Sequence, residues 1–376
     1  MNFDFNDRQR ALRKKIKGLF DHDAKEALNQ LEVEDTDQVR DALLHWLKML
    51  GKKGYLDLGL ENGDDETTLL AAQESLATTS SSLFLSVEVN ARIFGRLISV
   101  CGTHEQKADI LPALKEGQVI GAVALSEEGM SIENNPLYTS GKPAHDGFNV
   151  SGSKGHVVNA PIADWIAVAG RMEEGVALFL INKGSEGLSI GQRLSTLGYN
   201  GATVAAITLE NCPVPAKGII GPFEGIEILK TVRMWEDQVL TAASLGLMHR
   251  CFDAASNYAK NHMSGGKPII AYQEVGFKLA EMLTLLQTAQ LLAYRASWMT
   301  ETRDKEVGVL VHCAKVFCAE SAEEVASKAL QILGGHGYVR GNPAEEGYRD
   351  AKYLQIAGTS SEISRMKIGD QVLERE

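Results

Sequence analysis

Hydrophobic residues recur every three to four positions through most of the first third of the chain, a spacing typical of helices that bury one face. The clearest stretches are Gln9–Phe20, Val39–Leu50 and Ser82–Val100. Thr103 and Gln106 fit a capping box, in which each side chain bonds the other residue's backbone N–H, so a further helix is expected to begin there. Residues 1–118 are therefore predicted to form an N-terminal α domain.

The pattern changes near residue 119, where short runs rich in β-branched and aromatic residues alternate with Gly, Pro, Asn and Asp. These runs are Val119–Leu125, Phe148–Ser151, Trp165–Ala169, Val176–Ile181 and Thr203–Glu210. Their composition and spacing are typical of strands separated by turns. We expect residues 119–224 to form a small central β-barrel domain.

Three long helical stretches follow, Glu227–His262, Tyr272–Glu301 and Val307–Leu333. The second stretch has a wide apolar surface formed by Leu279, Met282, Leu283, Leu286, Leu292 and Tyr294. Long apolar helices usually pack into a bundle, often across a subunit interface. Residues 225–376 are predicted to form a C-terminal four-helix-bundle domain, and the fold class is α + β with three domains.

Composition narrows the class of protein without naming a function. Hydrophobic residues make up 44% and charged residues 23% of the chain, as in ordinary globular proteins. No apolar run reaches the ~18 residues of a membrane span, and the first residues resemble neither a signal peptide nor a transit peptide. The net charge of -11 argues against nucleic acid as a partner. The five cysteines are scattered without a CxxC pair, so we expect no metal site and a cytoplasmic location.

The densest group of residues with chemical potential follows the last long helical stretch. It reads Gln331-Ile332-Leu333-Gly334-Gly335-His336-Gly337-Tyr338. Three glycines within four residues let a backbone turn sharply and approach a ligand closely, as in phosphate-binding loops. Glycines after a helix end also serve as a simple cap and turn. From these residues alone, both interpretations stay open.

Two further segments extend this cluster into a pattern of more than thirty positions without a gap. They are Pro343-Ala344-Glu345-Glu346-Gly347-Tyr348-Arg349-Asp350-Ala351-Lys352 and Ile356-Ala357-Gly358-Thr359-Ser360-Ser361-Glu362-Ile363-Ser364-Arg365. The whole pattern resembles the C-terminal signature of the acyl-CoA dehydrogenase superfamily. The order of helical, β and helical domains agrees with that family over nearly the full chain. The resemblance implies a tetramer with FAD bound between two subunits.

The resemblance also implies which residues contact FAD: Val123, Leu125, Ser126, His156, Val157, Val158, His262, Ser264, Gln273, Gln331, Gly334, Gly335, Ser360 and Glu362. The glycine loop, which in the family meets the cofactor of the neighbouring subunit, is intact. Ser126 replaces a Thr and keeps its hydroxyl. Val158 replaces a Thr that hydrogen-bonds flavin N5, a loss of about 1 kcal/mol or more where the flavin atom stays unsatisfied. His262 replaces an Arg that pairs with the pyrophosphate, and Lys267 could partly substitute for it.

Desaturating an acyl thioester needs a carboxylate that takes the α-proton while hydride leaves to the flavin. Gly358 stands where most family members have this Glu, so only its backbone N–H could act, by binding the thioester carbonyl. The isovaleryl- and long-chain branch carries the base on the first long C-terminal helix instead, at the position of Glu236. Partial burial there would raise its pKa toward a useful range. Asp237 replaces a family Arg on the substrate side, and Ile132 replaces a Ser that touches the substrate.

These residues leave three functions open. The first is FAD-dependent α,β-dehydrogenation of an unusual acyl-CoA, with Glu236 as base and electrons passed to an electron-transfer flavoprotein. The second is a degenerate subunit that completes the FAD site of an active paralogue in a heteromer. The third is non-dehydrogenating thioester chemistry on the same fold. The acyl group, the carrier and the electron acceptor are not determined by the sequence.

Overall fold

A computed structural model of the chain describes residues 4–20, 28–60, 65–129, 137–224, 226–302 and 306–373. Its first part is helical, with α1 (Asp7–Lys17), α3 (Thr36–Lys52), α4 (Glu66–Ala77), α5 (Ser81–Glu88), the π-helix η1 (Val89–Gly95), α6 (Arg96–Cys101) and α7 (His104–Lys115). Thr103 caps α7, and both hydrogen bonds of the predicted capping box are present. Helix α4 was not predicted from the sequence.

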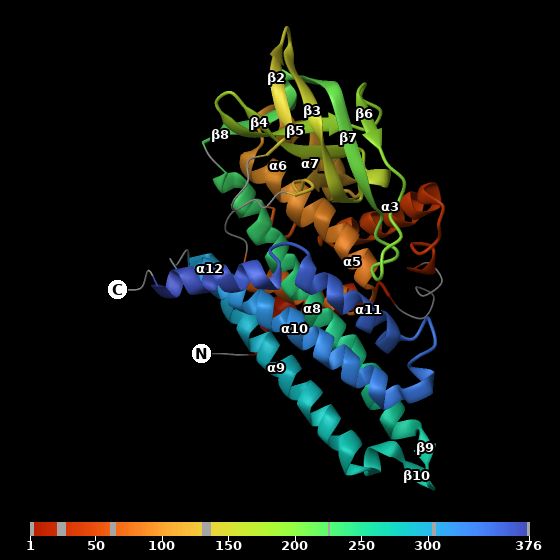
Figure 1. The fold of residues 1–376 in the computed structure, drawn as a ribbon. Coiled ribbons are helices and arrows are strands. Elements are labelled where there is room, and N and C mark those ends of the chain that lie inside the picture. Colours follow the sequence, from red (N-terminus) through yellow and green to blue (C-terminus); the bar gives the residue numbers. More distant parts are fainter. Residues whose placement is uncertain are drawn as a thin grey trace.

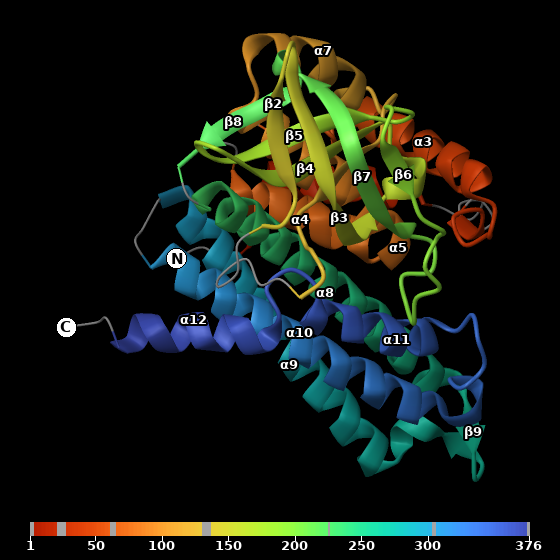
Figure 2. The same cartoon turned by 45° about the horizontal axis from the view of Figure 1, so that its top comes forward.

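The central part is one eight-stranded sheet whose strands succeed one another in the order β6-β7-β3-β2-β4-β5-β8, with β1 paired to β4. The strands are β1 (Gly121–Ala124), β2 (Ser140–Ala144), β3 (Gly147–Val158), β4 (Trp165–Met172), β5 (Gly175–Asn182), β6 (Leu188–Ile190), β7 (Val204–Pro215) and β8 (Ile219–Phe223). Short 3₁₀ turns occupy η2 (Ala160–Ile162) and η3 (Ala216–Gly218). Most neighbours are antiparallel, but β1 runs parallel to β4. Figure 2 shows the sheet curving over the N-terminal helices.

The last part is a bundle of long helices. Its elements are α8 (Glu227–Asn261), β9 (Met263–Ser264), β10 (Lys267–Pro268), η4 (Ile269–Ala271), α9 (Gln273–Thr302), α10 (Val307–Leu333), η5 (Gly334–His336), α11 (Pro343–Ile356) and α12 (Ser361–Leu373). Figure 1 shows the sheet above the bundle and the β9–β10 hairpin at the far end of α8 and α9. The predicted fold class is confirmed.

Helix α8 is the central element, because it packs against α4, α9, α10 and α11. Its middle, from Val239 to Met248, is continuously buried, so this stretch cannot show the one-sided pattern of a surface helix. None of the described helices combines the length and the apolar character needed to cross a membrane. The N-terminal part of α8 lies beneath the sheet, at the boundary between the β and helical parts (Figure 1).

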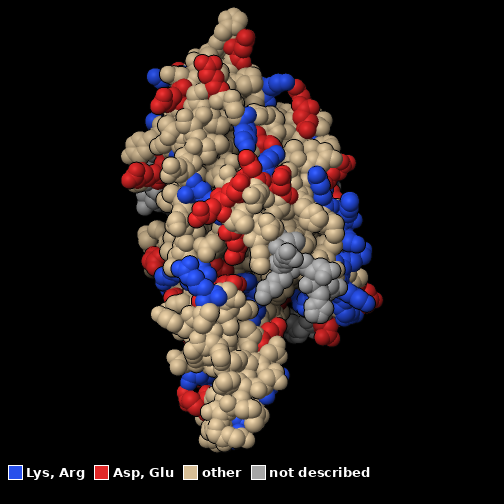
Figure 3. All heavy atoms as spheres, turned by 90° about the vertical axis from the view of Figure 1, so that its right-hand side faces the viewer, with Lys and Arg blue, Asp and Glu red and all other residues tan. Residues whose placement is uncertain are grey.

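The outer face of α9 keeps large apolar side chains in contact with solvent in the single chain. Phe277, Leu291 and Trp298 are each more than half exposed. Figure 3 shows acidic and basic side chains interspersed over the upper part of one face, whereas the narrow lower end carries few charged groups. An exposed apolar surface of this kind is typical of contact with another chain.

Candidate active site

A chain of polar contacts links the first turns of α8 to the end of β1. The Arg233 guanidinium donates from Nη1 to Glu236 Oε2 at 2.6 Å and from Nη2 to Ser126 Oγ at 2.9 Å. The Glu236 side chain is 28% exposed, so it is partly buried as expected. The arginine partner was not expected from the sequence. The structure thus joins the predicted base to a predicted flavin contact that lies over a hundred residues away.

Asp237, the next residue, points into the protein. Its side chain is fully buried, and Oδ1 accepts the backbone N–H of Thr359 at 2.7 Å. Gly358 has φ +65, and a Cβ atom there would lie 2.5 Å from the same oxygen. Asp237 therefore contacts this turn from inside the protein, which the sequence did not indicate. Burial raises the pKa of Asp237 to about 6, against hydrogen bonding from Thr359 that lowers it.

The chain after β1 is fastened by a buried ion pair. Lys154 on β3 donates to the backbone oxygen of Leu125 at 3.0 Å and to Glu127 Oε1 at 2.6 Å. Glu127 also accepts the backbone N–H groups of Tyr138 and Thr139. Burial raises the pKa of Glu127, but the hydrogen bonds and the charge of Lys154 bring it below its usual value. Glu127 is thus a structural carboxylate that fixes the position of Ser126.

The remaining predicted flavin contacts on this side lie in the β part and in the turn before α12. Val157 is buried and Val158 is half-buried on β3, while His156, in the irregular stretch between the pairings of Lys154 and Val157, is exposed. Val123 is half-buried and lies on β1. Ser360 accepts the Ile363 N–H with its side chain at the start of α12, and Glu362 is exposed. Ile132 lies outside the described residues.

A second set of predicted residues gathers at the other end of α8. A groove of about 410 Å³ is lined by Tyr258, His262, Ser264, Ile269, Ile332, Leu333, Gly334, Gly335 and His336. The His262 ring stacks on Tyr258 with centroids 4.6 Å apart and meets His336 edge-on at 5.6 Å. A Cβ atom at Gly334 or Gly335 would meet nothing within 4 Å. This half of the site is therefore an open aromatic groove, with exposed Gln273 and Gln331 nearby in sequence.

The two sets are far apart within one chain. Glu236 lies on α8, and His262 directly follows the last residue of that helix, Asn261, so at 1.5 Å per residue the two are roughly 40 Å apart. Figure 1 shows the corresponding ends of α8 beneath the sheet and beside the β9–β10 hairpin. The structure thus brings Ser126, Glu236 and the turn at Gly358 together, and separately brings His262 and Ser264 to Gly334 and Gly335.

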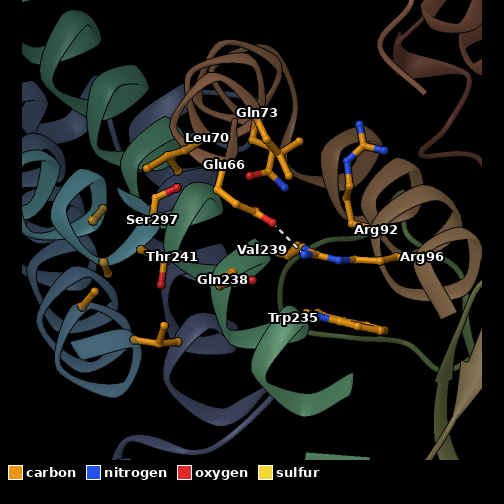
Figure 4. A pocket seen from close by; sticks show the side chains of 15 residues that line it. Glu66, Leu70, Gln73, Arg92, Arg96, Trp235, Gln238, Val239, Thr241 and Ser297 are labelled. Carbon is orange, nitrogen blue, oxygen red and sulfur yellow. Dashed lines mark hydrogen bonds and ion pairs between the residues drawn. The ribbon is translucent and has the colours of Figure 1, made fainter. Parts of the chain in front are cut away.

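A small cavity lies beside α8 at Trp235, Gln238 and Val239. It measures about 30 Å³, which is room for about two water molecules. Figure 4 shows Arg96 between Glu66 and Trp235 at this cavity. The Arg96 to Glu66 ion pair is 2.6 Å long, and the guanidinium lies 5.1 Å above the Trp235 ring.

Comparison with known proteins shows which protein family shares this architecture. Models of the acyl-CoA dehydrogenase N-terminal, middle and C-terminal domains match residues 6–118, 122–212 and 224–373. The chain is 32% identical to mitochondrial isovaleryl-CoA dehydrogenase of Oryza sativa subsp. japonica over 315 residues, covering 81% of this chain and 76% of the relative. The chain belongs to the acyl-CoA dehydrogenase family. Members of this family are oxidoreductases that act on CH–CH bonds and use FAD.

Two solved structures share the fold across the chain. Butyryl-CoA dehydrogenase from Megasphaera elsdenii superposes with a TM-score of 0.89 at 24% identity, covering 99% of this chain and 100% of that chain. PigA with FAD and proline superposes with a TM-score of 0.88 at 21% identity, covering 100% of both chains. At these identities the likeness shows the fold alone.

Sequence reasoning missed three cations of the acyl-CoA dehydrogenase site. Arg233, Lys154 and a buried lysine on α10, Lys315, each contact a predicted site segment. Only Arg233 left a local signal, because its position three residues before Glu236 places both side chains on one face of a helix. The other two contacts depend on packing between distant elements.

Proposed function

We propose that this chain catalyses FAD-dependent α,β-dehydrogenation of an acyl-CoA thioester with an unusual acyl group, with Glu236 as the base. The observation that carries the proposal is the chain of contacts from Glu236 through Arg233 to Ser126. Through Arg233, this chain links the Glu236 carboxylate to the Ser126 hydroxyl, which the family resemblance assigns to the flavin. A carboxylate bonded through one oxygen keeps further lone pairs that can accept a proton.

The residues present fit FAD. On one side, Ser126 offers a hydroxyl, with its position fixed by Lys154 and Glu127. On the other side, the open loop at Gly334 and Gly335 borders a groove wide enough to admit a ligand. Bound FAD would supply the hydride acceptor. The chain's own part is to hold the thioester carbonyl at the Gly358 amide and to take the α-proton on Glu236.

An oligomer completes this proposal. Because the two halves of the FAD site lie at opposite ends of α8, the groove at His262 would serve the flavin of a second subunit. The exposed apolar residues of α9 supply a surface for that association. We propose a homotetramer, with an electron-transfer flavoprotein as acceptor. None of the five cysteines, all of which the structure describes, forms a disulfide, which agrees with the reducing conditions of the cytoplasm.

The test compares Glu236→Gln with Glu227→Gln, both on α8. Glu227 pairs with Lys230 three residues away, as Glu236 pairs with Arg233, but is exposed and distant from Ser126. The protein is loaded with FAD, and flavin reduction by isovaleryl-CoA, butyryl-CoA and a panel of branched, cyclic and aryl acyl-CoA thioesters is followed by absorbance. Glu236→Gln should slow reduction by ~10²–10⁴-fold, and Glu227→Gln should leave it within about twofold of wild type.

Two results would change this assignment. Equal reduction rates in the Glu236→Gln and wild-type proteins would show that the base lies elsewhere. A colourless wild-type protein that does not take up added FAD would favour the degenerate partner subunit, in which substituted residues such as Val158 and His262 no longer support a cofactor. Light scattering on the same samples reports the oligomer.

A further inference from the structure

The turn that carries Gly358 is held from two sides by buried opposite charges. Asp237 on α8 accepts the Thr359 N–H through Oδ1 at 2.7 Å. Lys315 on α10 donates from Nζ to the Thr359 carbonyl oxygen and, at 3.4 Å, to that of Gln355. Both side chains are fully buried. The backbone N–H and C=O groups of Thr359 are therefore bound by side chains from two different helices.

The contacts leave no room for a side chain at residue 358. A Cβ atom on Gly358 would lie 2.5 Å from Asp237 Oδ1 and 2.8 Å from Leu240 Cδ1. The positive φ of +65 is also a conformation that residues with a Cβ rarely adopt. A carboxylate base at the common family position is thus incompatible with Asp237. Asp237 on α8 therefore requires a glycine at residue 358 in the turn.

Stability alone does not explain two buried opposite charges at this place. Burial raises the pKa of Asp237 and lowers the pKa of Lys315, because each charged form loses contact with water. His312, one turn before Lys315, places Nδ1 3.7 Å from Asp237 Oδ2. Buried charge pairs are often no more stable than well-packed apolar side chains of similar volume. What the pair adds is a fixed geometry for the peptide groups around Gly358.

Resting on the function proposed above, we propose that Asp237 and Lys315 are positioning residues that fix the Gly358–Thr359 turn opposite Glu236. Through this turn they set the direction of the Gly358 amide toward the thioester carbonyl. They also exclude a side chain from residue 358, so the α-proton must go to the Glu236 carboxylate on α8. Neither residue touches the reacting atoms.

The test uses FAD-loaded tetramer and the acyl-CoA that reduces the wild-type flavin fastest among isovaleryl-CoA, butyryl-CoA and the branched, cyclic and aryl thioesters. Asp237→Ala removes the acceptor for the Thr359 N–H, whereas Asp237→Asn keeps an oxygen in the same place. Lys315→Met removes the donor and keeps the length of the side chain. Lys328→Met is the matched control, because Lys328 lies on the same helix in an exposed pair with Glu281.

Asp237→Ala and Lys315→Met should lower kcat about tenfold to a hundredfold, the usual effect of misplacing a reacting group by about 1 Å, while KM changes less than about threefold. Asp237→Asn should recover kcat to within about threefold of wild type. Hydrogen exchange of the peptide that contains residues 355–361 should speed up in Asp237→Ala and Lys315→Met only. Because a smaller folded fraction would also lower the apparent kcat, kcat is expressed per bound FAD, so a merely structural role would leave it unchanged.

Three outcomes overturn the proposal. The first is faster hydrogen exchange at the turn with kcat equal to that of Lys328→Met. This result would show that the contacts of Asp237 and Lys315 with Thr359, here called the clamp, are structural only. The second is an Asp237→Asn variant as slow as Asp237→Ala, which shows that the charge and not the acceptor matters. The third is a wild-type protein that binds FAD but is reduced by none of the acyl-CoA probes, which removes the proposed function and the catalytic role of the clamp together. In that case the exchange result still reports whether the clamp holds the turn.

Discussion

Replacing Glu74 with glutamine should destabilise the junction between the N-terminal helices and the bundle. Glu74 on α4 is fully buried, and its two oxygens accept four side-chain donors. Arg13 and Tyr294 donate to Oε2, each at 2.8 Å. His249 lies 2.7 Å and Gln290 2.6 Å from Oε1. A glutamine amide has one oxygen and one NH₂ group, so two of the four donors would face this NH₂ group instead of an acceptor.

The size of the effect follows from the pKa of Glu74. Burial raises this pKa, but the hydrogen bond with His249 and the charge of Arg13 outweigh burial and bring it from 4.5 to about 2. At about 1.4 kcal/mol per pKa unit, the lowered value corresponds to about 3 kcal/mol of stability. Because the folded-state pKa is depressed, this stability is complete above pH 4.5 and is lost as the pH falls through 2.

Urea denaturation followed by tryptophan fluorescence measures the prediction at pH 7 and at pH 3. Glu74→Gln should lower the free energy of unfolding by about 3 kcal/mol at pH 7, and the gap to wild type should narrow by about 2 kcal/mol at pH 3. Glu281→Gln, at an exposed ion pair, should stay within about 0.5 kcal/mol of wild type. A gap below about 1 kcal/mol at pH 7, or an equal gap at both pH values, would refute the reasoning.

Two further substitutions test features of the site. Gly358→Ala should lower the free energy of unfolding by about 1–3 kcal/mol because of its positive φ and the contact with Asp237. Gly369→Ala, inside α12 with no neighbour within 4 Å, should instead raise the free energy of unfolding by up to about 1 kcal/mol. Thermal unfolding of the two variants checks both signs. Lys154→Met should cost about 3–5 kcal/mol because it leaves the Glu127 charge buried and unpaired, and a double variant with Glu127→Gln should lose less than the two single variants added together.

Periodicity predicted α9 and α10 well because each buries part of its surface and exposes the rest. Helix α10 begins and ends at the predicted residues, Val307 and Leu333, and α9 agrees within one residue at each end. Helix α4 was missed because Thr68–Ala77 are all buried, so no polar face marks its period. The predicted run Phe148–Ser151 is only part of β3, since the bulges after Val150 and Lys154 interrupt its alternation.

The candidate site was predictable only where a family pattern fixed the position of a residue. That pattern located Glu236, Ser126 and Gly358, and the structure brings them to one region. It could not show Arg233 between Glu236 and Ser126, because contact between α8 and β1 depends on how the domains pack. Asp237 was expected on the substrate side, and the structure instead places it against the backbone of Thr359.

The unbroken course of α8 limits how this protein can change during evolution. One residue inserted or deleted between Glu236 and His262 would rotate one end against the other by about 100° and shift it by about 1.5 Å. In the proposed oligomer, such a change would misalign Glu236, the proposed base, with the groove that contributes to the next subunit's site. Substitutions can accumulate along α8, but its length cannot vary, and changes in length belong instead to the hairpin that follows His262.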